Sequence, residues 1–544
     1  MTRYITLLFL MLKFCMPVIG QNFYWIAFSD KNNTEYSLTS PENYLSERAI
    51  QRRTQQNIPI DSLDLPVNKT YIDSVLTLGV TYVHSSKWLN GITVATSYGN
   101  LDFILNWSFV KSVHLTKPGV TTKSANRKFS EEQISEVVPI DTGYYGASAH
   151  QVEMMEGQFL HNLGYKGEGL HIAVLDGGFL KADELPALDS LWVNNQILGT
   201  KDFVNPQSDF FSTDYHGMSV LSCMGGNYPG QLIGTAPEAS YWLLRSEDAG
   251  SEYIVEEDNW AVAAEFADSV GADIINSSLG YYTFDDPSTN HTYADMDGET
   301  TRVTKAANVA ASRGMLVFVS AGNERRNSWF RIIAPSDGPG VIGVGAVDED
   351  LSPALFTSVG PAYNGNLKPN LAAMGVRSIA QLSSGSIGPI SGTSFSSPIL
   401  AGMAACLWQR YPGKSAIEIK EALEESGSKY LSPDSLVGYG IPNMRTASTI
   451  LDPMSVKVSQ RNAEWKVFPN PVSDFLMIEY NGMPPSGDVK LELFTTDGKL
   501  TKQWVYPAAQ KIVLNNWSAI KNGFYVLRIN TESTTATVKV SKIN

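Results

Sequence analysis

The sequence predicts an α/β protein whose main domain is a parallel sheet flanked by helices. Continuous apolar runs such as "HIAVLDGGF" and "GMLVFVSAGN" suit strands that are covered on both faces. Alanine-rich helical segments separate these runs, and alternating strand and helix is typical of a parallel sheet. Because 544 residues exceed what one hydrophobic core usually supports, we expect further domains at both ends.

Residues 1–20 predict a secretory signal peptide. Arg3 precedes a largely apolar run from Ile5 to Phe14 in which Lys13 is the one charged residue, and small Gly20 ends the segment. A membrane anchor would need roughly 18 to 20 uninterrupted apolar residues. We therefore expect export, with no membrane span in the mature chain.

Residues 21–118 predict a small α+β module. Its strand-like pieces include "FYWIAFS" and "GITVATS", and "PENYLSERAIQRRTQQ" is helix-like. Between residues 119 and 145 the sequence turns polar, with "TTKSANRKFSEEQ". We expect an exposed linker there.

Residues 146–452 carry the predicted parallel sheet. The buried strands are "HIAVLDGGF", "ASYWLLRS", "ADIINSSLG", "GMLVFVSAGN" and "GVIGVGAV", and the helices between them include "NWAVAAEFADSVG" and "TTRVTKAANVAASRG". Functional residues of such sheets gather at the carboxyl ends of the strands.

Residues 464–544 predict an all-β sandwich. Helical patterns vanish there, and short runs such as "DFLMIEY", "VKLELFTTDGKL" and "GFYVLRIN" follow at regular spacing. The Asp497-Gly498 pair is a hairpin turn signal.

The net charge and the number of cysteines limit the partners and the type of fold that we expect. A net charge of −14 would repel a phosphate backbone, so we expect no nucleic-acid partner, and we expect a monomer. Only Cys223 and Cys406 would remain after signal removal, which excludes a disulfide scaffold. They are interpreted as two buried side chains, with one bridge between them left open.

Candidate groups for acyl transfer follow the predicted strands. Asp176 ends the strand of "IAVLDGGF", and Asn323 follows that of "VFVSAGNE". His216, in "TDYHGMSV", precedes a helix of small residues. Nucleophilic catalysis needs such a base, a group that orients it and donors for an oxyanion. In isolation His216 is better interpreted as a surface or satisfied core residue, Asp176 as a capping or turn residue and Asn323 as a turn residue.

The segment "ISGTSFSSPI" supplies a candidate nucleophile. We expect a helix from Ser394 to about Tyr411, with Pro398 in its first turn, where no backbone N–H is needed. Free N–H groups of that turn favour negative charge. From this segment alone, an N-capped buried helix without chemistry is an open alternative.

Together these motifs resemble the subtilisin-like serine peptidases, the S8 family. The match spans about residues 146 to 450, with Asp176, His216, Asn323 and Ser394 in the contexts "VLDGG", "HGMSV", "SAGNE" and "SGTSFSSP". The resemblance implies a serine endopeptidase with an Asp-His-Ser triad, an acyl-enzyme and an oxyanion asparagine. It also implies that Ser278, Leu279 and Gly280 pair with the substrate backbone. Gly177 stands where the family commonly has a hydroxyl residue.

The flanking modules add two further resemblances. The N-terminal module is similar to the inhibitory propeptides of this class, with a permanent accessory domain as the alternative. The C-terminal module resembles type IX secretion sorting domains through "VFPNPVSD", "NGFYVLRI" and "VKVSKIN". These resemblances imply a zymogen that is secreted or attached to the cell surface across a bacterial outer membrane. Its partners would be polypeptide substrates and the type IX machinery.

The residues assign no cofactor. Calcium is compatible with the family resemblance, but no ligands can be assigned, and Asp295 and Asp297 in "YADMDGET" lack the spacing of an EF-hand loop. Two alternative functions stay open on the sequence. One is a catalytically inactive binding or scaffold protein, and the other is an acyltransferase or ligase that uses the same triad.

Overall fold

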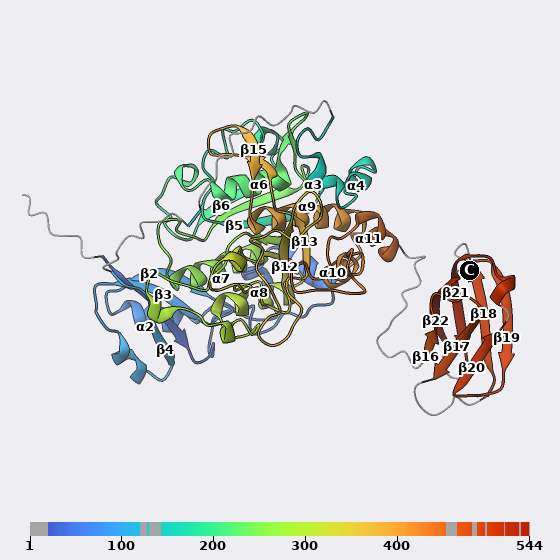
Figure 1. Cartoon of the computed structure of the whole chain (residues 1–544). Coiled ribbons are helices and arrows are strands. Elements are labelled where there is room, and N and C mark those ends of the chain that lie inside the picture. Colours follow the sequence, from blue (N-terminus) through green and yellow to red (C-terminus); the bar gives the residue numbers. More distant parts are fainter. Residues whose placement is uncertain are drawn as a thin grey trace, which may run out of the picture. The chain divides into compact units, whose positions relative to one another are not determined.

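The structure is a computed structural model that forms two compact units, Met1–Leu451 and Asp452–Asn544 (Figure 1). It describes residues 20–119, 128–129, 143–452, 465–480, 487–495, 498–515, 517–531 and 535–542. The predicted signal peptide, apart from its last residue, and most of the predicted linker lie outside the described residues.

A seven-stranded parallel sheet forms the centre of the first unit, as the sequence predicted. Its order is β13 (Leu371–Met374), β12 (Ile342–Val347), β11 (Leu316–Ser320), β10 (Ile274–Ser277), β5 (His171–Asp176), β9 (Ser240–Arg245) and β6 (Ile197–Asp202). The five predicted strands occupy the middle of the sheet. The edge strands β6 and β13 were not predicted, because "ILGTKD" is only half-buried and "LAAM" is four residues long.

Helices cover both faces of this sheet. On one face α6 (His216–Gly225) and α9 (Thr393–Arg410) share an apolar cluster with Ile172 and Val174 of β5. On the other, α7 (Val255–Val270) and α8 (Arg302–Ser312) pack with Ala173 and Leu175 (Figure 1). Successive residues of a strand point to opposite faces, so one apolar run supplies two cores.

Short elements complete the first unit around the sheet. The helices are α3 (Ala149–Glu153), α4 (Gln158–Asn162), α5 (Asp189–Val193), α10 (Ala416–Glu425) and α11 (Met444–Leu451). Two small antiparallel pairs join β7 (Asn227–Tyr228) to β8 (Leu232–Ile233) and β14 (Ser378–Gln381) to β15 (Ile387–Ile390).

The N-terminal module is an antiparallel sheet with two helices, which confirms the predicted α+β character. The strand order is β2 (Thr81–Ser86), β3 (Gly91–Thr96), β1 (Asn22–Phe28) and β4 (Val110–Lys117), and the helices are α1 (Glu47–Gln55) and α2 (Lys69–Leu76). The module has its own apolar cluster, which includes Ile26, Ile92 and Val94.

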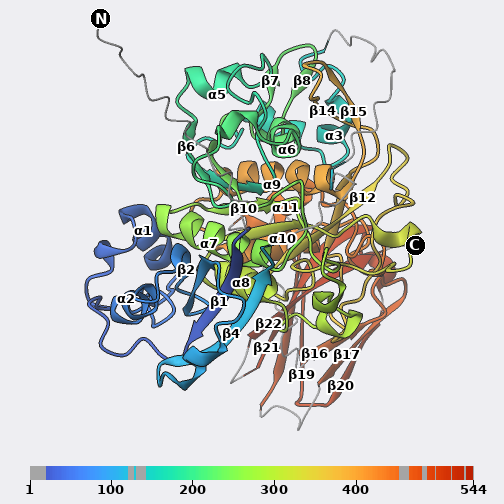
Figure 2. The ribbon, with the colours of Figure 1, turned by 90° about the vertical axis from the view of Figure 1, so that its left-hand side faces the viewer.

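Helix α7 lies beside the N-terminal module (Figure 2), and Asp268 of this helix anchors the module to the central sheet domain. It forms ion pairs with Arg52 at 2.5 Å, with Arg53 at 2.8 Å and with Lys87 at 3.3 Å. Asp268 is fully buried, and both arginines are almost so. Burial would raise the pKa of Asp268, but the three positive charges outweigh it and lower the pKa.

Two further side chains of α7 contact the same module. The Glu265 carboxylate accepts hydrogen bonds from the backbone N–H groups of Lys87, at 2.8 Å, and Trp88, at 3.0 Å. The Oδ1 atom of Asn259 lies 2.8 Å from Nε2 of His84. Helix α7 therefore binds the module through buried polar groups along its length.

The second unit consists of two antiparallel sheets around one apolar core. One contains β16 (Trp465–Phe468), β17 (Phe475–Tyr480) and β20 (Lys511–Asn515), and the other contains β19 (Leu500–Tyr506), β18 (Val489–Thr495), β21 (Gly523–Asn530) and β22 (Thr535–Lys542). Side chains of both sheets, among them Leu476, Leu491 and Leu527, form one cluster. The predicted turn joins β18 to β19, with Gly498 at a positive φ, while Asp497 lies outside the described residues.

The fold bears on two features that the sequence raised, a membrane span and a disulfide bridge. None of the helices in the described ranges has both the length and the apolar character of a membrane span. Cys223 and Cys406 are both buried and free, so the bridge that the sequence left open does not form.

We predict that Asp268→Asn strongly destabilises the full-length chain. Removing one partner of a buried ion pair leaves uncompensated charge and typically costs about 3–5 kcal/mol. Denaturant unfolding measures the change, with Asp73→Asn as the control, because Asp73 pairs with Lys69 at the exposed surface. The control should leave the unfolding midpoint unchanged, and equal effects of the two variants would contradict the anchoring role of Asp268.

Candidate active site

The predicted site residues lie at the carboxyl ends of three adjacent strands. Asp176 is the last residue of β5, and Ser278 follows the end of β10. Asn323 lies three residues beyond the end of β11. Because β5, β10 and β11 pair in parallel, their carboxyl ends meet at the same edge of the sheet.

Asp176 binds the imidazole of His216. The Asp176 Oδ1 atom accepts a hydrogen bond from His216 Nδ1 at 2.7 Å and a second from the backbone N–H of Gly177 at 2.7 Å. Gly217 permits this approach, since a Cβ atom there would lie 2.7 Å from the Cβ of Asp176. When Nδ1 carries the proton, Nε2 is left free to accept one.

His216 begins α6 and is surrounded by negative charge. Its backbone N–H donates to Asp214 Oδ1 at 3.0 Å. Burial would lower the pKa of His216, but the charges of Asp176, Asp214 and Glu247 outweigh it and raise the pKa above 6.5. The imidazole is therefore a stronger base than a histidine in water.

Ser394 is the second residue of α9, and its neighbour Phe395 contacts His216. The Phe395 and His216 rings are 5.9 Å apart, measured between centroids. The Ser394 hydroxyl donates to the carbonyl oxygen of Ser278 at 3.4 Å, a long hydrogen bond. Among the described residues Ser394 Oγ makes no hydrogen bond to His216, and hydrogen bonds between catalytic groups are often formed only when substrate is bound.

Helix α9 begins at Thr393, so Pro398 is its sixth residue and lies beyond the predicted first turn. In that position proline cannot donate a hydrogen bond to the carbonyl oxygen of Ser394. The Ser278 hydroxyl replaces the missing donor at 2.7 Å. Because Pro398 leaves this carbonyl oxygen without a helical donor, Ser278 binds the backbone of Ser394 to the end of β10.

Asn323 is oriented by Thr393, a residue that the sequence analysis did not single out. The Oδ1 atom of Asn323 accepts hydrogen bonds from the backbone N–H of Thr393 at 2.9 Å and from its hydroxyl at 3.0 Å. The amide nitrogen therefore points away from Thr393. It lies 3.7 Å from where a Cβ atom of Gly392 would stand, beside the first turn of α9.

The predicted substrate-pairing residues continue from β10 past Ser394. Ser278 contacts Ser394 through both of its oxygen atoms. Leu279 is buried in the apolar cluster under α7, and Gly280 packs closely against Ile333. The structure thus places the segment beside the candidate nucleophile.

Two residues of the predicted linker lie in the site. The Phe129 ring stacks on His216, with centroids 4.0 Å apart and an interplanar angle of 17°. The Lys128 ammonium pairs with Glu252 at 2.8 Å and Glu256 at 2.6 Å. The prediction of an exposed linker is therefore wrong at these two residues, because long-range contacts outweigh the local polar composition.

Three family models match this chain. The Subtilase family matches residues 167–440, the Peptidase S8 propeptide domain of Bacteroidota matches residues 23–132, and the Secretion system C-terminal sorting domain matches residues 466–543. Subtilisin NAT of Bacillus subtilis subsp. natto is 26% identical over 56% of this chain and 72% of its own length. Serine protease AprX of Bacillus subtilis (strain 168) is 29% identical over 56% of this chain and 70% of its own.

We predict that Ser278→Ala and Pro398→Ala are coupled in their effect on stability. Ser278→Ala leaves the buried carbonyl oxygen of Ser394 without its donor, which typically costs about 1–3 kcal/mol. In a Pro398→Ala background the new N–H group can donate to that oxygen, so the loss should be smaller. A double-mutant cycle of unfolding free energies measures this coupling, and additive effects would refute it.

Proposed function

The chain belongs to the subtilase family, and from this premise we propose that Ser394, His216 and Asp176 act as nucleophile, general base and orienting carboxylate. The observation that carries the proposal is the 2.7 Å hydrogen bond between Asp176 and His216. The same imidazole lies beside Phe395, the residue that follows Ser394. These groups match the needs of nucleophilic catalysis in kind and in order.

The family matches give the class of enzyme, its synthesis as a precursor and its secretion. The chain is a subtilisin-like serine endopeptidase that acts on polypeptides, and its propeptide makes it a zymogen. Its sorting domain directs secretion through the type IX system. The sequence-based identification of all three parts is confirmed.

In the proposed acylation step, Ser394 Oγ attacks the carbonyl carbon of the scissile peptide bond. His216 Nε2 takes the hydroxyl proton, and Asp176 stabilises the imidazolium that forms. The tetrahedral intermediate then collapses, the C–N bond breaks, and His216 gives the proton to the leaving amine. This leaves an ester between the substrate acyl group and Ser394.

Two donors support the proposed oxyanion. The backbone N–H of Ser394 lies in the first turn of α9, where no partner within the helix is available. The amide of Asn323 is preoriented, since Thr393 holds its oxygen. Donors fixed in advance cost no reorganisation as negative charge develops.

In the proposed deacylation step, water replaces the amine. His216 removes a proton from the water, which attacks the ester carbonyl carbon, and the same two donors stabilise the second oxyanion. Collapse returns the proton to Ser394 Oγ and releases the new carboxyl terminus. We propose that these steps use no cofactor and that the enzyme acts as a monomer.

We predict different kinetic losses for two substitutions in the processed enzyme. Ser394→Ala removes the nucleophile and should lower kcat by roughly 10⁶-fold. Asn323→Ala removes one oxyanion donor and should lower kcat on the order of 10²- to 10³-fold with KM unchanged. Hydrolysis of a quenched fluorescent peptide measures both, with exposed Asn366→Ala as the control. Retention of turnover by Ser394→Ala would refute the proposed nucleophile.

We also predict that activity rises with pH through a midpoint above 6.5. His216 must be neutral to act as the base, and its pKa is raised by Asp176, Asp214 and Glu247 against the effect of burial. Asp214→Asn should therefore move the acidic limb of kcat/KM to lower pH. The matched change at exposed Asp209 should leave it in place. An acidic limb that stays put in Asp214→Asn would contradict the assignment of the limb to His216.

A further inference from the structure

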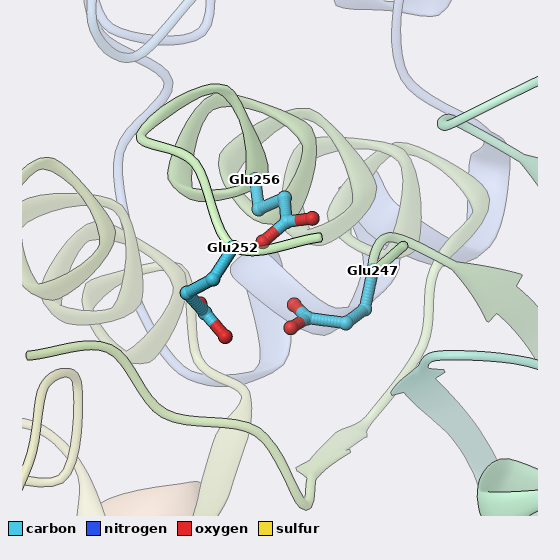
Figure 3. A group of neighbouring side chains, drawn as sticks. All are labelled: Glu247, Glu252 and Glu256. Carbon is cyan, nitrogen blue, oxygen red and sulfur yellow. The ribbon is translucent and has the colours of Figure 1, made fainter. Parts of the chain in front are cut away.

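Lys128 of the propeptide enters a buried group of three glutamates beside the candidate site. Its ammonium pairs with Glu247, with Glu252 at 2.8 Å and with Glu256 at 2.6 Å. Only 13% of the Lys128 side chain is exposed. Figure 3 shows Glu256 on the first turn of α7 and the other two glutamates on the chain that leads into it.

The same stretch of the propeptide contacts the enzyme through its backbone and contacts the candidate base through its next side chain. The Lys128 backbone N–H lies 3.5 Å from the carbonyl oxygen of Ala249. The next residue, Phe129, stacks on His216 and fills the space beside Gly177, where a Cβ atom would lie 2.7 Å from its ring. Adjacent propeptide residues therefore contact the glutamates and the candidate base.

The protein itself positions two of the three carboxylates. Glu247 accepts a hydrogen bond from the hydroxyl of Tyr281 at 2.6 Å. Glu256 accepts from the backbone N–H groups of Tyr253, at 3.3 Å, and Asp248, at 3.4 Å. These bonds do not involve Lys128, so the propeptide is not needed to make them.

Glu252 is different, because among the described residues its carboxylate pairs with Lys128 alone. Its Oε2 atom pairs with Lys128, while its buried Oε1 atom has no hydrogen-bond partner among the described residues. Burial, with the charges of Glu247 and Asp285, raises the pKa of Glu252 to about 8 even though Lys128 opposes the shift. Burial also raises the pKa of Glu256 well above its usual range. Burial therefore disfavours the charged form of both groups, and the Lys128 ammonium is the charge that opposes this effect.

The arrangement suits an ammonium group better than a guanidinium. Three carboxylate oxygens, one from each glutamate, lie within 4.8 Å of one another. A lysine ammonium is a compact charge with three donors, one for each oxygen. The planar fork of arginine is matched instead to two oxygens of one carboxylate.

We propose that Glu247, Glu252 and Glu256 form a specificity pocket for a lysine side chain of the polypeptide substrate. That lysine immediately precedes the substrate residue that packs on His216, and the propeptide occupies the pocket with Lys128 before processing. The inference rests on the proposed peptidase function and names the substrate class that the same site prefers. A divalent cation is the competing occupant of three such carboxylates.

A matched peptide series tests the proposal on the processed wild-type enzyme. The quenched peptides are identical except at the residue before a phenylalanine, which is lysine, arginine, methionine, glutamine or glutamate. We expect kcat/KM to be highest for lysine and to exceed that for methionine by roughly 10- to 100-fold, the effect of one charge-assisted hydrogen bond. Equal rates for the lysine and methionine peptides, with casein still hydrolysed, would overturn the pocket alone. Hydrolysis of neither casein nor any peptide would overturn the proposed function and the pocket with it.

Glu252→Gln then links any preference to the pocket. This variant should reduce the ratio of lysine to methionine rates by about tenfold. Glu184→Gln, the same change at an exposed position, should keep the wild-type ratio. A preference that Glu252→Gln leaves intact would overturn the assignment to these glutamates.

Repeating the series with EDTA and with excess calcium chloride separates the two occupants. A lysine preference that is the same in both supports the side-chain pocket. The other outcome is that calcium abolishes the lysine preference of the wild type, while the preference of Glu252→Gln is the same in calcium as in EDTA. This result would show that the glutamates hold a metal ion and would overturn the proposal.

Discussion

The parallel register of β5 between β10 and β9 is the constraint on which the site depends. It brings Leu175 opposite Ser277, so that Asp176 and Ser278 emerge at one edge of the sheet. Helix α9 then delivers Ser394 to that edge, where Ser278 binds its backbone. Asp176, His216, Ser278 and Ser394 lie on or next to a packed strand or helix, so their geometry is set by the two apolar cores.

Helix α7 joins the propeptide to the candidate specificity pocket. Its first turn carries Glu256, which pairs with Lys128, and its later turns carry Glu265 and Asp268, which bind the propeptide body. The propeptide therefore binds the enzyme at two places along α7. Its Phe129 also covers the imidazole of His216. Release of the body would leave only the short Lys128 segment to compete with a substrate.

The sequence predicted the parts of the protein that are encoded locally. Strong apolar runs identified the five central strands, and the small-residue motifs around Asp176, His216, Asn323 and Ser394 identified the candidate site. Local patterns could not reveal Thr393 as the residue that orients Asn323, because that contact joins segments 70 positions apart. Nor could they place Lys128 among Glu247, Glu252 and Glu256, since a polar stretch and scattered glutamates are ordinary surface composition until the fold buries them together. The role of Ser278 as a substitute donor likewise depends on where α9 begins.

The central claim is that Ser394 is an activated nucleophile. Treating the processed protein with a serine-directed phosphonate and mapping the modified peptide by mass spectrometry tests it most directly. The account predicts one adduct, on Ser394, which fails to form when His216 is replaced by alanine in a protein that still folds. A folded wild-type protein that takes up no phosphonate, or takes it up on another serine, would contradict the account and favour a binding protein built on the same fold.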